Sequence, residues 1–219
     1  MRTPWIKQGI SRLVPAPTWQ PFPPLPETLR LVAPGAVIVD VGAGGRQITP
    51  ATITVDYRAF PGTRLRCDAH HLGLRDATVD CLVSTGTFEH IAEPARALDE
   101  FRRVLKPGGL LHIEVPFLFP FHSDPIDHTR WTVDGLRALC GRAGFSEVRS
   151  GAHQGPATAL NTVLIAYAVS WFQGRRARRI VELLATLVVS PHKYLDWFLV
   201  RRAHAHVAAA GVFFVGRKT

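Results

Sequence analysis

The hydrophobic pattern from residue 36 onward consists of short apolar runs, each of which ends near a glycine, a proline or an acidic residue. Short apolar runs bounded in this way are typical of strands that are buried on both faces of a parallel sheet. Runs of this kind, together with the weaker strand patterns at 64–67 and 145–149, predict strands over 36–41, 52–55, 64–67, 79–84, 110–115, 145–149 and 212–215.

Two stretches between these runs show helical periodicity. The first begins near Pro94, which suits the first turn of a helix, and should stop at Lys106–Gly109. The second should begin after the N-cap Thr132 and end at the C-cap Gly144. The inward residues are Leu98, Phe101, Val104 and Leu105 in the first helix and Leu136, Leu139 and Cys140 in the second. Strands alternating with helices predict a Rossmann-like, doubly wound α/β fold with a seven-stranded, mostly parallel sheet whose last strand is antiparallel.

The stretch between the sixth and seventh runs is too long for a simple turn, and we predict a helical insertion over 151–207. Residues 150–174 contain no Asp, Glu, Lys or Arg. A group of four arginines, the arginine cluster, follows and comprises Arg175, Arg176, Arg178 and Arg179. An amphipathic apolar stripe then covers 180–188. The expected organisation is a proline-rich lead-in over 1–30 and one domain over 31–219 that includes the insertion.

The composition adds a bias toward anionic partners. The chain has 219 residues, enough for one domain with a sizeable core, and a formal net charge of +9 at pH 7. A basic surface attracts membranes, nucleic acids and phosphorylated molecules. The three cysteines share no CxxC spacing, and no apolar leader follows the N-terminal charges. We therefore expect reduced thiols, no cleaved signal peptide and a cytoplasmic protein.

The strongest local signal is Val39-Asp40-Val41-Gly42-Ala43-Gly44-Gly45. An acidic residue near the end of a buried strand, followed by closely spaced glycines, lets the backbone approach a ligand that side chains would block. A tight strand-to-helix turn would explain the glycines equally well. Asp56 ends the second predicted strand, where a carboxylate can meet ribose hydroxyls, and Asp68 ends the third. The combination favours a nucleotide-type cofactor.

Taken together, these motifs resemble the class I S-adenosylmethionine-dependent methyltransferases, particularly the ubiquinone-type branch. The resemblance covers about residues 36–150. Its carriers are Val39–Gly44, Cys67–Ala69, Val79–Ser84, Phe88–Ile91, Arg103–Gly109 and Ala143–Phe145. One departure is Arg46, which stands where many relatives have a third glycine. A nicotinamide-dependent dehydrogenase is disfavoured, because the loop lacks the final glycine of GxGxxG.

The resemblance implies S-adenosylmethionine as the cofactor and assigns its contacts. The glycine loop would pack on the methionine portion, the end of the second strand would bind the ribose, the end of the third would flank the adenine, and Thr85 would lie near the sulfonium. The cofactor-binding residues implied are Asp40, Gly42, Ala43, Gly44, Asp56, Tyr57, Asp68, Ala69 and Thr85.

A second polar group follows the fifth predicted strand, at residues 122–130. This segment looks like one found in methyltransferases encoded among glycosyltransferases, which implies a saccharide or glycolipid hydroxyl as the acceptor. Histidine is suited to accept a hydroxyl proton at neutral pH. The expected catalytic residues are His122 as the first choice for the base, His90 as the second, and Asp127. The expected substrate-binding residues are Asp124, His128 and Arg130.

Two other interpretations of this segment stay open. Asp127 and Arg130 can pair and, with a histidine, simply pin a loop. A metal site from His122, Asp124, Asp127 and His128 would draw nearly all of its ligands from one short loop, so we expect no metal. The function predicted is O-methylation of a saccharide or lipid-linked saccharide. The alternatives are methylation of a soluble secondary metabolite and a non-catalytic cofactor-binding or scaffold protein.

The insertion predicts contact with a membrane surface. A second crossing over 180–200 would bring charges to bilayer depth, so a spanning pair of helices is disfavoured. An in-plane cap formed by 156–200, with the arginine cluster on anionic headgroups at the inner face of the membrane, fits better. Helices that complete the core or form a homodimer interface are the alternative. Nucleic acid is not favoured, because aromatic residues do not interleave with the arginines.

Overall fold

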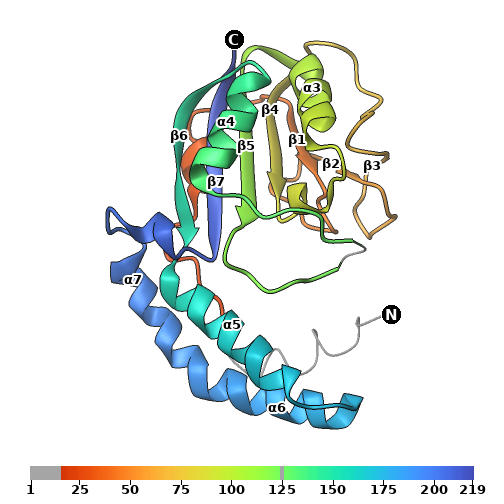
Figure 1. The fold of residues 1–219 in the computed structure, drawn as a ribbon. Helices are drawn as coiled ribbons and strands as arrows, with labels where there is room; N and C mark the ends of the chain where they lie inside the picture. The colour runs from red at the N-terminus through yellow and green to blue at the C-terminus, as the bar shows by residue number, and fades with distance from the viewer. Residues whose placement is uncertain (1–15, 124–125) are drawn as a thin grey trace. The chain divides into compact units, whose positions relative to one another are not determined.

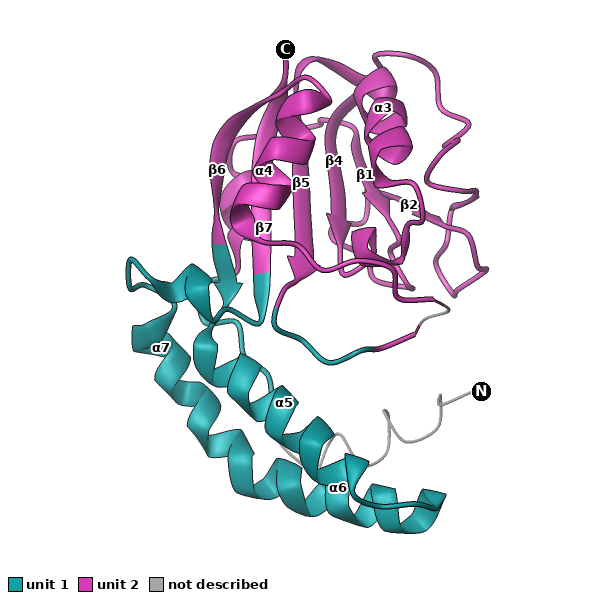
Figure 2. Ribbon diagram, viewed as in Figure 1, with its two compact units in different colours: residues 1–22, 118–121, 152–211 teal, residues 23–117, 122–151, 212–219 magenta. Residues whose placement is uncertain are grey.

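A computed structural model of the chain describes residues 16–123 and 126–219, and its main feature is one seven-stranded sheet (Figure 1). The described residues fall into two compact units (Figure 2). The sheet unit comprises residues 23–117, 122–151 and 212–219, and the helical unit comprises residues 16–22, 118–121 and 152–211.

The strand order confirms the predicted doubly wound α/β fold. The strands are β1 (Ile38–Val41), β2 (Ile53–Asp56), β3 (Leu65–Arg66), β4 (Val79–Thr85), β5 (Leu105–Pro116), β6 (Phe145–Gln154) and β7 (Gly211–Lys218). They lie in the order β3-β2-β1-β4-β5-β7-β6. The pairs formed by β3, β2, β1, β4 and β5 are parallel. The last strand, β7, runs in the opposite direction between β5 and β6 (Figure 1).

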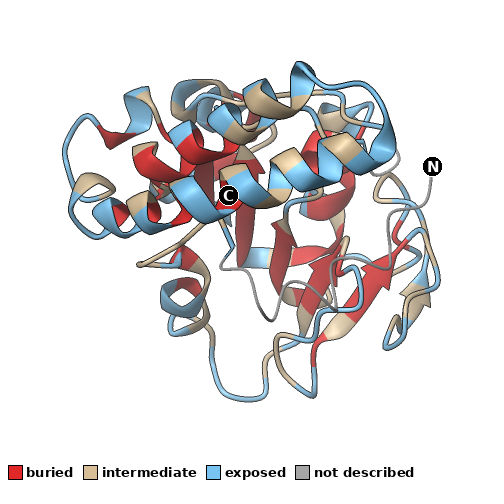
Figure 3. Cartoon of the chain, turned by 90° about the horizontal axis from the view of Figure 1, so that it is seen from below, coloured by how far each residue is buried: buried red, intermediate tan, exposed pale blue. Residues whose placement is uncertain are grey.

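Two helices cover the later connections of the sheet unit. The helix α3 (Pro94–Val104) connects β4 to β5 and buries Leu98, Phe101 and Val104 completely. The helix α4 (Val133–Arg142) begins as predicted, because the Thr132 side chain accepts the N–H of Gly135 at 3.0 Å. Each fully buried large apolar side chain contributes about 1.5–3 kcal/mol. Buried residues accordingly gather on the strands and on the helix faces that meet them (Figure 3).

The connections at the other end of the sheet are loops. Between β1 and β4 the described chain forms turns and extended segments over 42–52, 57–64 and 67–78. Prolines and glycines such as Pro50 and Gly62 interrupt these segments, and both residue types disfavour helix. The fifth strand also differs from the prediction, because β5 begins at Leu105, directly after α3. The expected helix stop, Lys106–Gly109, lies in this strand, where Lys106 Nζ pairs with Asp80 Oδ1 at 2.7 Å.

The helical unit contains α5 (Pro156–Ser170), α6 (Arg175–Val189), η3 (Ser190–Leu195), α7 (Asp196–Leu199) and η4 (Ala205–Val207). The side chain of Asp196 caps α5 by accepting the N–H groups of Ala157 and Thr158, each at 2.9 Å. Part of the predicted lead-in packs here: the ring of Trp19 stacks on that of Trp197 at 6.1 Å. The rest of the described lead-in forms α2 (Pro24–Leu29) in the sheet unit. Across residues 16–123 and 126–219, every helix falls short of the length and apolarity that a bilayer crossing requires.

Candidate functional site

A pocket of about 380 Å³ lies in the sheet unit, where β1, β2 and β4 end. The carboxyl ends of parallel strands meet at one edge of the sheet, and ligands of doubly wound folds bind there. Its walls come from the loop after β1, the end of β2, the residues after β3 and the loop after β4. The lining residues are Val41, Gly42, Gly44, Val55, Asp56, Tyr57, Arg58, Phe60, Cys67, Asp68, Ala69, His70, Gly86, Thr87, His90, Ile91 and Ala92.

The glycine loop after β1 has a backbone that a ligand can approach closely. Gly42 has a φ of 75°, which favours glycine, and a Cβ atom there would lie 2.1 Å from the side chain of Thr87. No atom lies within 4 Å of the corresponding point on Gly44, so this residue leaves open space at the pocket. The N–H of Gly42 donates to the Val55 carbonyl at 2.8 Å, which ties the loop to β2. Any side chain at Gly42 would therefore strain the backbone and displace Thr87.

Asp56 connects this loop to the end of β2. Its Oδ2 atom accepts the N–H of Gly44 at 3.0 Å, and its Oδ1 atom accepts the N–H of Arg58 at 2.9 Å. The carboxylate is almost fully buried, yet it lines the pocket beside the half-exposed Tyr57. Asp56 thus holds the loop and places its carboxyl group at the pocket wall.

The residues after β3 form the wall predicted to flank the adenine. Asp68 and Ala69 both line the pocket. Hydrogen bonds from His70, foremost that of its backbone N–H at 2.8 Å, hold the pKa of Asp68 below its usual range. Asp68 therefore carries a negative charge at neutral pH, and the pocket presents two carboxylates, those of Asp56 and Asp68.

Three of the predicted cofactor residues do not line the pocket, namely Asp40, Ala43 and Thr85. Asp40 is 0% exposed, and burial raises its pKa above the usual range. Arg46 opposes this effect, because its Nη2 atom lies 2.6 Å from Asp40 Oδ1 and its Nε donates to Oδ2 at 3.1 Å. The same guanidinium donates to the hydroxyl of Thr85. Arg46 therefore links the end of β1 to the end of β4.

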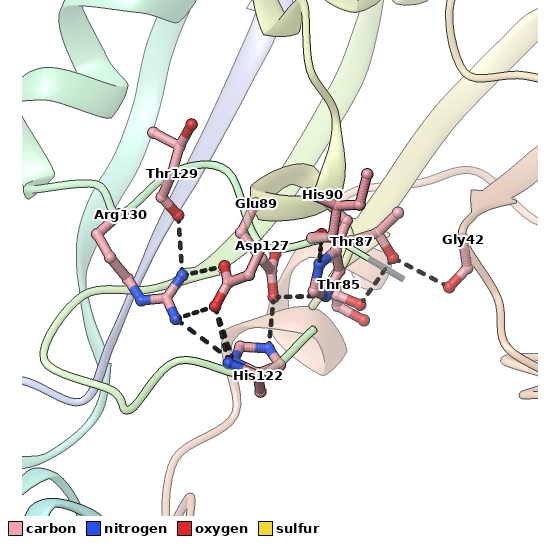
Figure 4. Close-up of polar contacts among 10 residues, drawn as sticks. Gly42, Thr85, Thr87, Glu89, His90, His122, Asp127, Thr129 and Arg130 are labelled. Atoms are coloured by element: carbon pink, nitrogen blue, oxygen red, sulfur yellow. Dashed lines mark hydrogen bonds and ion pairs between the residues drawn. The ribbon is translucent and has the colours of Figure 1, made fainter. Parts of the chain in front are cut away.

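A second group of polar side chains lies beside the pocket and combines η2 (Phe88–His90) with the loop after β5 (Figure 4). Glu89 Oε1 lies 3.5 Å from His122 Nε2 and 3.7 Å from His90 Nε2. The two imidazole rings meet edge to face, with centroids 5.1 Å apart. His90 also lines the pocket. The structure thus brings the two predicted bases together, with Glu89 between them.

Asp127 organises the loop that carries His122. Arg130 donates to both of its carboxylate oxygens, and the backbone N–H of His122 donates to Oδ2 at 2.9 Å. The hydrogen bonds from Arg130, followed by that from His122, lower the pKa of Asp127 to about 2. Its Oδ2 atom lies 3.6 Å from His122 Nδ1. Asp127 therefore stays ionised at neutral pH and holds His122 in place.

The remaining predicted acceptor-side residues have different positions. His128 is exposed, and its backbone N–H donates to the Glu89 carbonyl at 2.9 Å, so its contribution visible in the structure is to dock the loop on η2. Arg130 lies within the group through its pair with Asp127. Asp124 lies outside the described residues.

Glu89 is a site residue that the sequence analysis named only within a motif. It is 1% exposed, and its Oε2 atom has no hydrogen-bond partner among the described residues. The available signal was an acidic residue directly before His90 at the end of a strand. That signal is weak, because an acidic residue beside a histidine in a loop is usually solvated.

Comparison with known proteins finds a family match within the sheet unit. Residues 45–113 match the sequence profile of the family described as a methyltransferase domain. This match begins at the glycine loop and runs through β2, β3, β4 and α3 into β5. This part of the chain is therefore similar to methyltransferase domains. The comparisons confirm S-adenosylmethionine as the cofactor predicted from the sequence.

Two curated relatives are similar to part of the chain. Malonyl-[acyl-carrier protein] O-methyltransferase of Geobacter sulfurreducens is 36% identical over 97 residues, which are 37% of this chain and 36% of that protein. An uncharacterized methyltransferase of Mycolicibacterium vanbaalenii is 36% identical over 107 residues, which are 48% of this chain and 41% of that protein. The chain therefore spans less than half the length of these relatives.

The solved structures support the fold. A crystal structure of a SAM-dependent methyltransferase from Archaeoglobus fulgidus superimposes with a TM-score of 0.55 at 14% identity, covering 89% of this chain and 91% of that chain. At this identity the likeness concerns the fold alone. The loop carrying His122 and the helical unit lie outside the family match, so the acceptor must be argued from the residues themselves.

Proposed function

We propose that the protein transfers a methyl group from S-adenosylmethionine to a hydroxyl group of a saccharide or lipid-linked saccharide. The observation that carries this proposal is the position of the histidine pair. His90 lines the pocket of the methyltransferase domain, and His122 meets it edge to face from a different loop. Imidazoles beside a methyl donor suit an acceptor that must lose a proton.

The pocket fits the proposed cofactor. Gly42 and Gly44 leave room for close backbone approach, and the carboxylates of Asp56 and Asp68 suit a ligand that carries hydroxyl groups and a positive charge. When bound, S-adenosylmethionine supplies an electrophilic methyl group on a sulfonium. The chain's own residues then have to orient the acceptor and accept its proton.

We place the acceptor hydroxyl at the cluster of Glu89, His90 and His122. As the oxygen takes the methyl group its O–H bond must break, and S-adenosylhomocysteine leaves. We assign the loss of this proton to His122. Its Nε2 atom faces Glu89 Oε1, and its backbone N–H donates to Asp127, which holds the residue in position. Arg130 keeps Asp127 ionised, and its guanidinium group is the proposed contact for acceptor hydroxyls.

A membrane-linked acceptor is supported by the surface of the helical unit. The exposed residues on α5 follow a helical spacing of three and four, and the same holds for α6. On α5 and just beyond it they are Leu160, Val163, Leu164, Tyr167 and Trp171, and on α6 they are Ile180, Leu184, Leu187 and Val188. Large apolar side chains in two such stripes are typical of a surface that binds a partner or a membrane.

The arginine cluster indicates which partner to propose. All four arginines are exposed in the first turns of α6, and Trp171 and Phe172 lie just before them in the chain. Aromatic residues and arginines together are typical of helices that lie at the headgroup level of a bilayer. We therefore propose that the helical unit docks on an anionic membrane surface, which would bring a lipid-linked saccharide to the enzyme.

The proposed activity is tested by incubating the full chain with methyl-labelled S-adenosylmethionine and a panel of glycans, nucleotide sugars and a lipid extract. We expect label in a saccharide-containing product. His122→Ala should lower turnover by about 10²–10⁴-fold while leaving the affinity for S-adenosylhomocysteine unchanged. Equal loss of cofactor affinity or thermal stability in this variant would indicate a structural histidine. Label confined to small soluble metabolites would assign a different acceptor class.

A further inference from the structure

The geometry of Glu89, His90 and His122 points to a cation between them. The three facing atoms are Glu89 Oε1, His90 Nε2 and His122 Nε2, and they all lie within 4.8 Å of one another. The distances from the carboxylate oxygen, 3.5 and 3.7 Å, are too long for direct hydrogen bonds. Atoms that ligate one metal at about 2.0–2.2 Å are separated by similar distances.

The tautomer of His90 supports this interpretation. Its Nδ1 atom lies 2.7 Å from the carbonyl oxygen of Ile126, and a carbonyl can only accept, so Nδ1 carries the proton. In the neutral ring Nε2 then has an unprotonated lone pair, which faces the carboxylate. Metal-binding histidines characteristically donate their other ring N–H to a backbone carbonyl or a carboxylate. The Nδ1 atom of His122 lies 3.6 Å from Asp127 Oδ2, which is too long for a hydrogen bond, and 3.4 Å from Nη2 of Arg130, so only His90 has its tautomer set in this way.

The burial of Glu89 is an independent reason to expect a cation at this cluster. It is 1% exposed, and its Oε2 atom lacks a hydrogen-bond partner among the described residues. A buried carboxylate is costly unless positive charge compensates it. A divalent cation bound at Oε1, and within reach of Oε2, would supply that charge.

We propose that Glu89, His90 and His122 bind a divalent first-row transition-metal cation. Two imidazoles and one carboxylate favour zinc, manganese or iron over the oxygen-seeking magnesium and calcium. The sequence alone predicts no metal, because nearly all of the candidate ligands among His122, Asp124, Asp127 and His128 lie in one short loop. In the structure the ligands come from two separate segments, η2 and the loop after β5, so they can surround a cation from two sides.

The role of this cation rests on the proposed function. Because His90 lines the pocket, a cation held there could take the acceptor oxygen as a further ligand. Metal binding lowers the pKa of a bound hydroxyl, so its proton can pass to solvent water before the oxygen takes the methyl group. His122 would then act by holding the cation, and its loss would still abolish turnover.

The test is calorimetric titration of the full, chelator-treated chain with zinc and manganese, and with cobalt followed by its visible absorption. We expect one equivalent to bind and an absorption change typical of nitrogen and oxygen ligands. Glu89→Gln, His90→Asn and His122→Asn should each weaken binding by about tenfold or more. Thermal melts of each variant would establish that it is folded.

The matched control is the double variant His204→Asn and His206→Asn. These exposed histidines are neighbours in the helical unit and could bind metal adventitiously. Binding that survives in this control and fails in the three single variants supports the site. Binding lost in the control, or absent from the wild type, overturns it. Methyl transfer by a metal-free, chelator-treated wild type would overturn the role of the cation in the reaction while leaving the proposed function standing. Cation binding without methylation of any acceptor would support the metal site and count against the proposed function.

Discussion

At the residue scale, Arg46 shows how a departure from a family pattern can be compensated. It occupies the place of a customary glycine, and its guanidinium pairs with the buried Asp40 and donates to Thr85. A buried carboxylate left without such a partner destabilises a protein strongly. Arg46 is 39% exposed, so the loss on its removal should be smaller than for a fully buried pair.

We expect Arg46→Gln to lower the free energy of unfolding by about 1–3 kcal/mol near pH 7. Because burial raises the pKa of Asp40 in the folded chain, the unfolded chain ionises this carboxyl first as pH rises. Without Arg46 that pKa rises further, so the deficit should grow as pH rises through the pKa of Asp40 in the folded wild type, which lies above the unfolded value of about 4, and should be smaller below it.

Chemical denaturation at pH 4 and pH 7 measures this dependence. The control is Arg96→Gln, which removes an exposed arginine that pairs with the exposed Glu93 and should change stability little at either pH. An equal deficit of Arg46→Gln at both pH values would contradict the role assigned to the pair with Asp40.

Asp56 gives the second prediction at this scale. It accepts the N–H of Gly44 and lines the pocket, so we expect it to hold the glycine loop and also to contact a bound cofactor. Asp56→Ala should weaken the binding of S-adenosylhomocysteine by about 1–3 kcal/mol, measured by calorimetry. Asp99→Ala, an exposed carboxylate on α3, is the matched control. Wild-type affinity in Asp56→Ala would remove this residue from the site.

At the scale of elements, α5 and α6 lead to a testable prediction about membrane binding. Their apolar stripes are exposed, and the arginine cluster begins α6. Each arginine near an anionic surface contributes about 1 kcal/mol, and salt weakens this attraction. Replacing the four arginines of the cluster with glutamine should therefore reduce co-sedimentation with anionic vesicles, with little effect on neutral ones.

A matched variant separates the arginine cluster from the overall charge. Replacing Arg30, Arg75, Arg96 and Arg142 with glutamine removes the same charge from exposed positions of the sheet unit. This variant should keep most of its vesicle binding. Equal loss in both variants would indicate non-specific attraction. If the wild type does not bind vesicles and forms a stable dimer, the apolar stripes would instead form an interface between copies of the chain.

The elements also show where local sequence patterns were sufficient to predict secondary structure. Thr132 caps α4, and the apolar runs became strands near their predicted positions, because both depend on residues that are close in sequence. The boundary of β5 was wrong by several residues. A proline and two glycines at 107–109 usually end regular structure, but pairing with β4 continues the strand through them, with a register shift between Val79 and Cys81.

At the scale of the whole molecule, the sequence by itself determined the fold class and the pocket. The alternation of apolar runs and the glycine loop are short-range patterns, and the rule that ligands bind at the carboxyl ends of parallel strands converts them into a site. Gly42, Gly44, Asp56, Asp68 and their neighbours line the pocket for this reason.

Only the tertiary structure decided how side chains distant in sequence meet. His90 and His122 come together because β4 and β5 are adjacent parallel strands, so the segments that follow them share one edge of the sheet. The loop then docks through the Glu89 carbonyl, which buries the Glu89 side chain between the two rings. Burial and the tautomer of His90 depend on that docking, and no local pattern around residue 89 contains them.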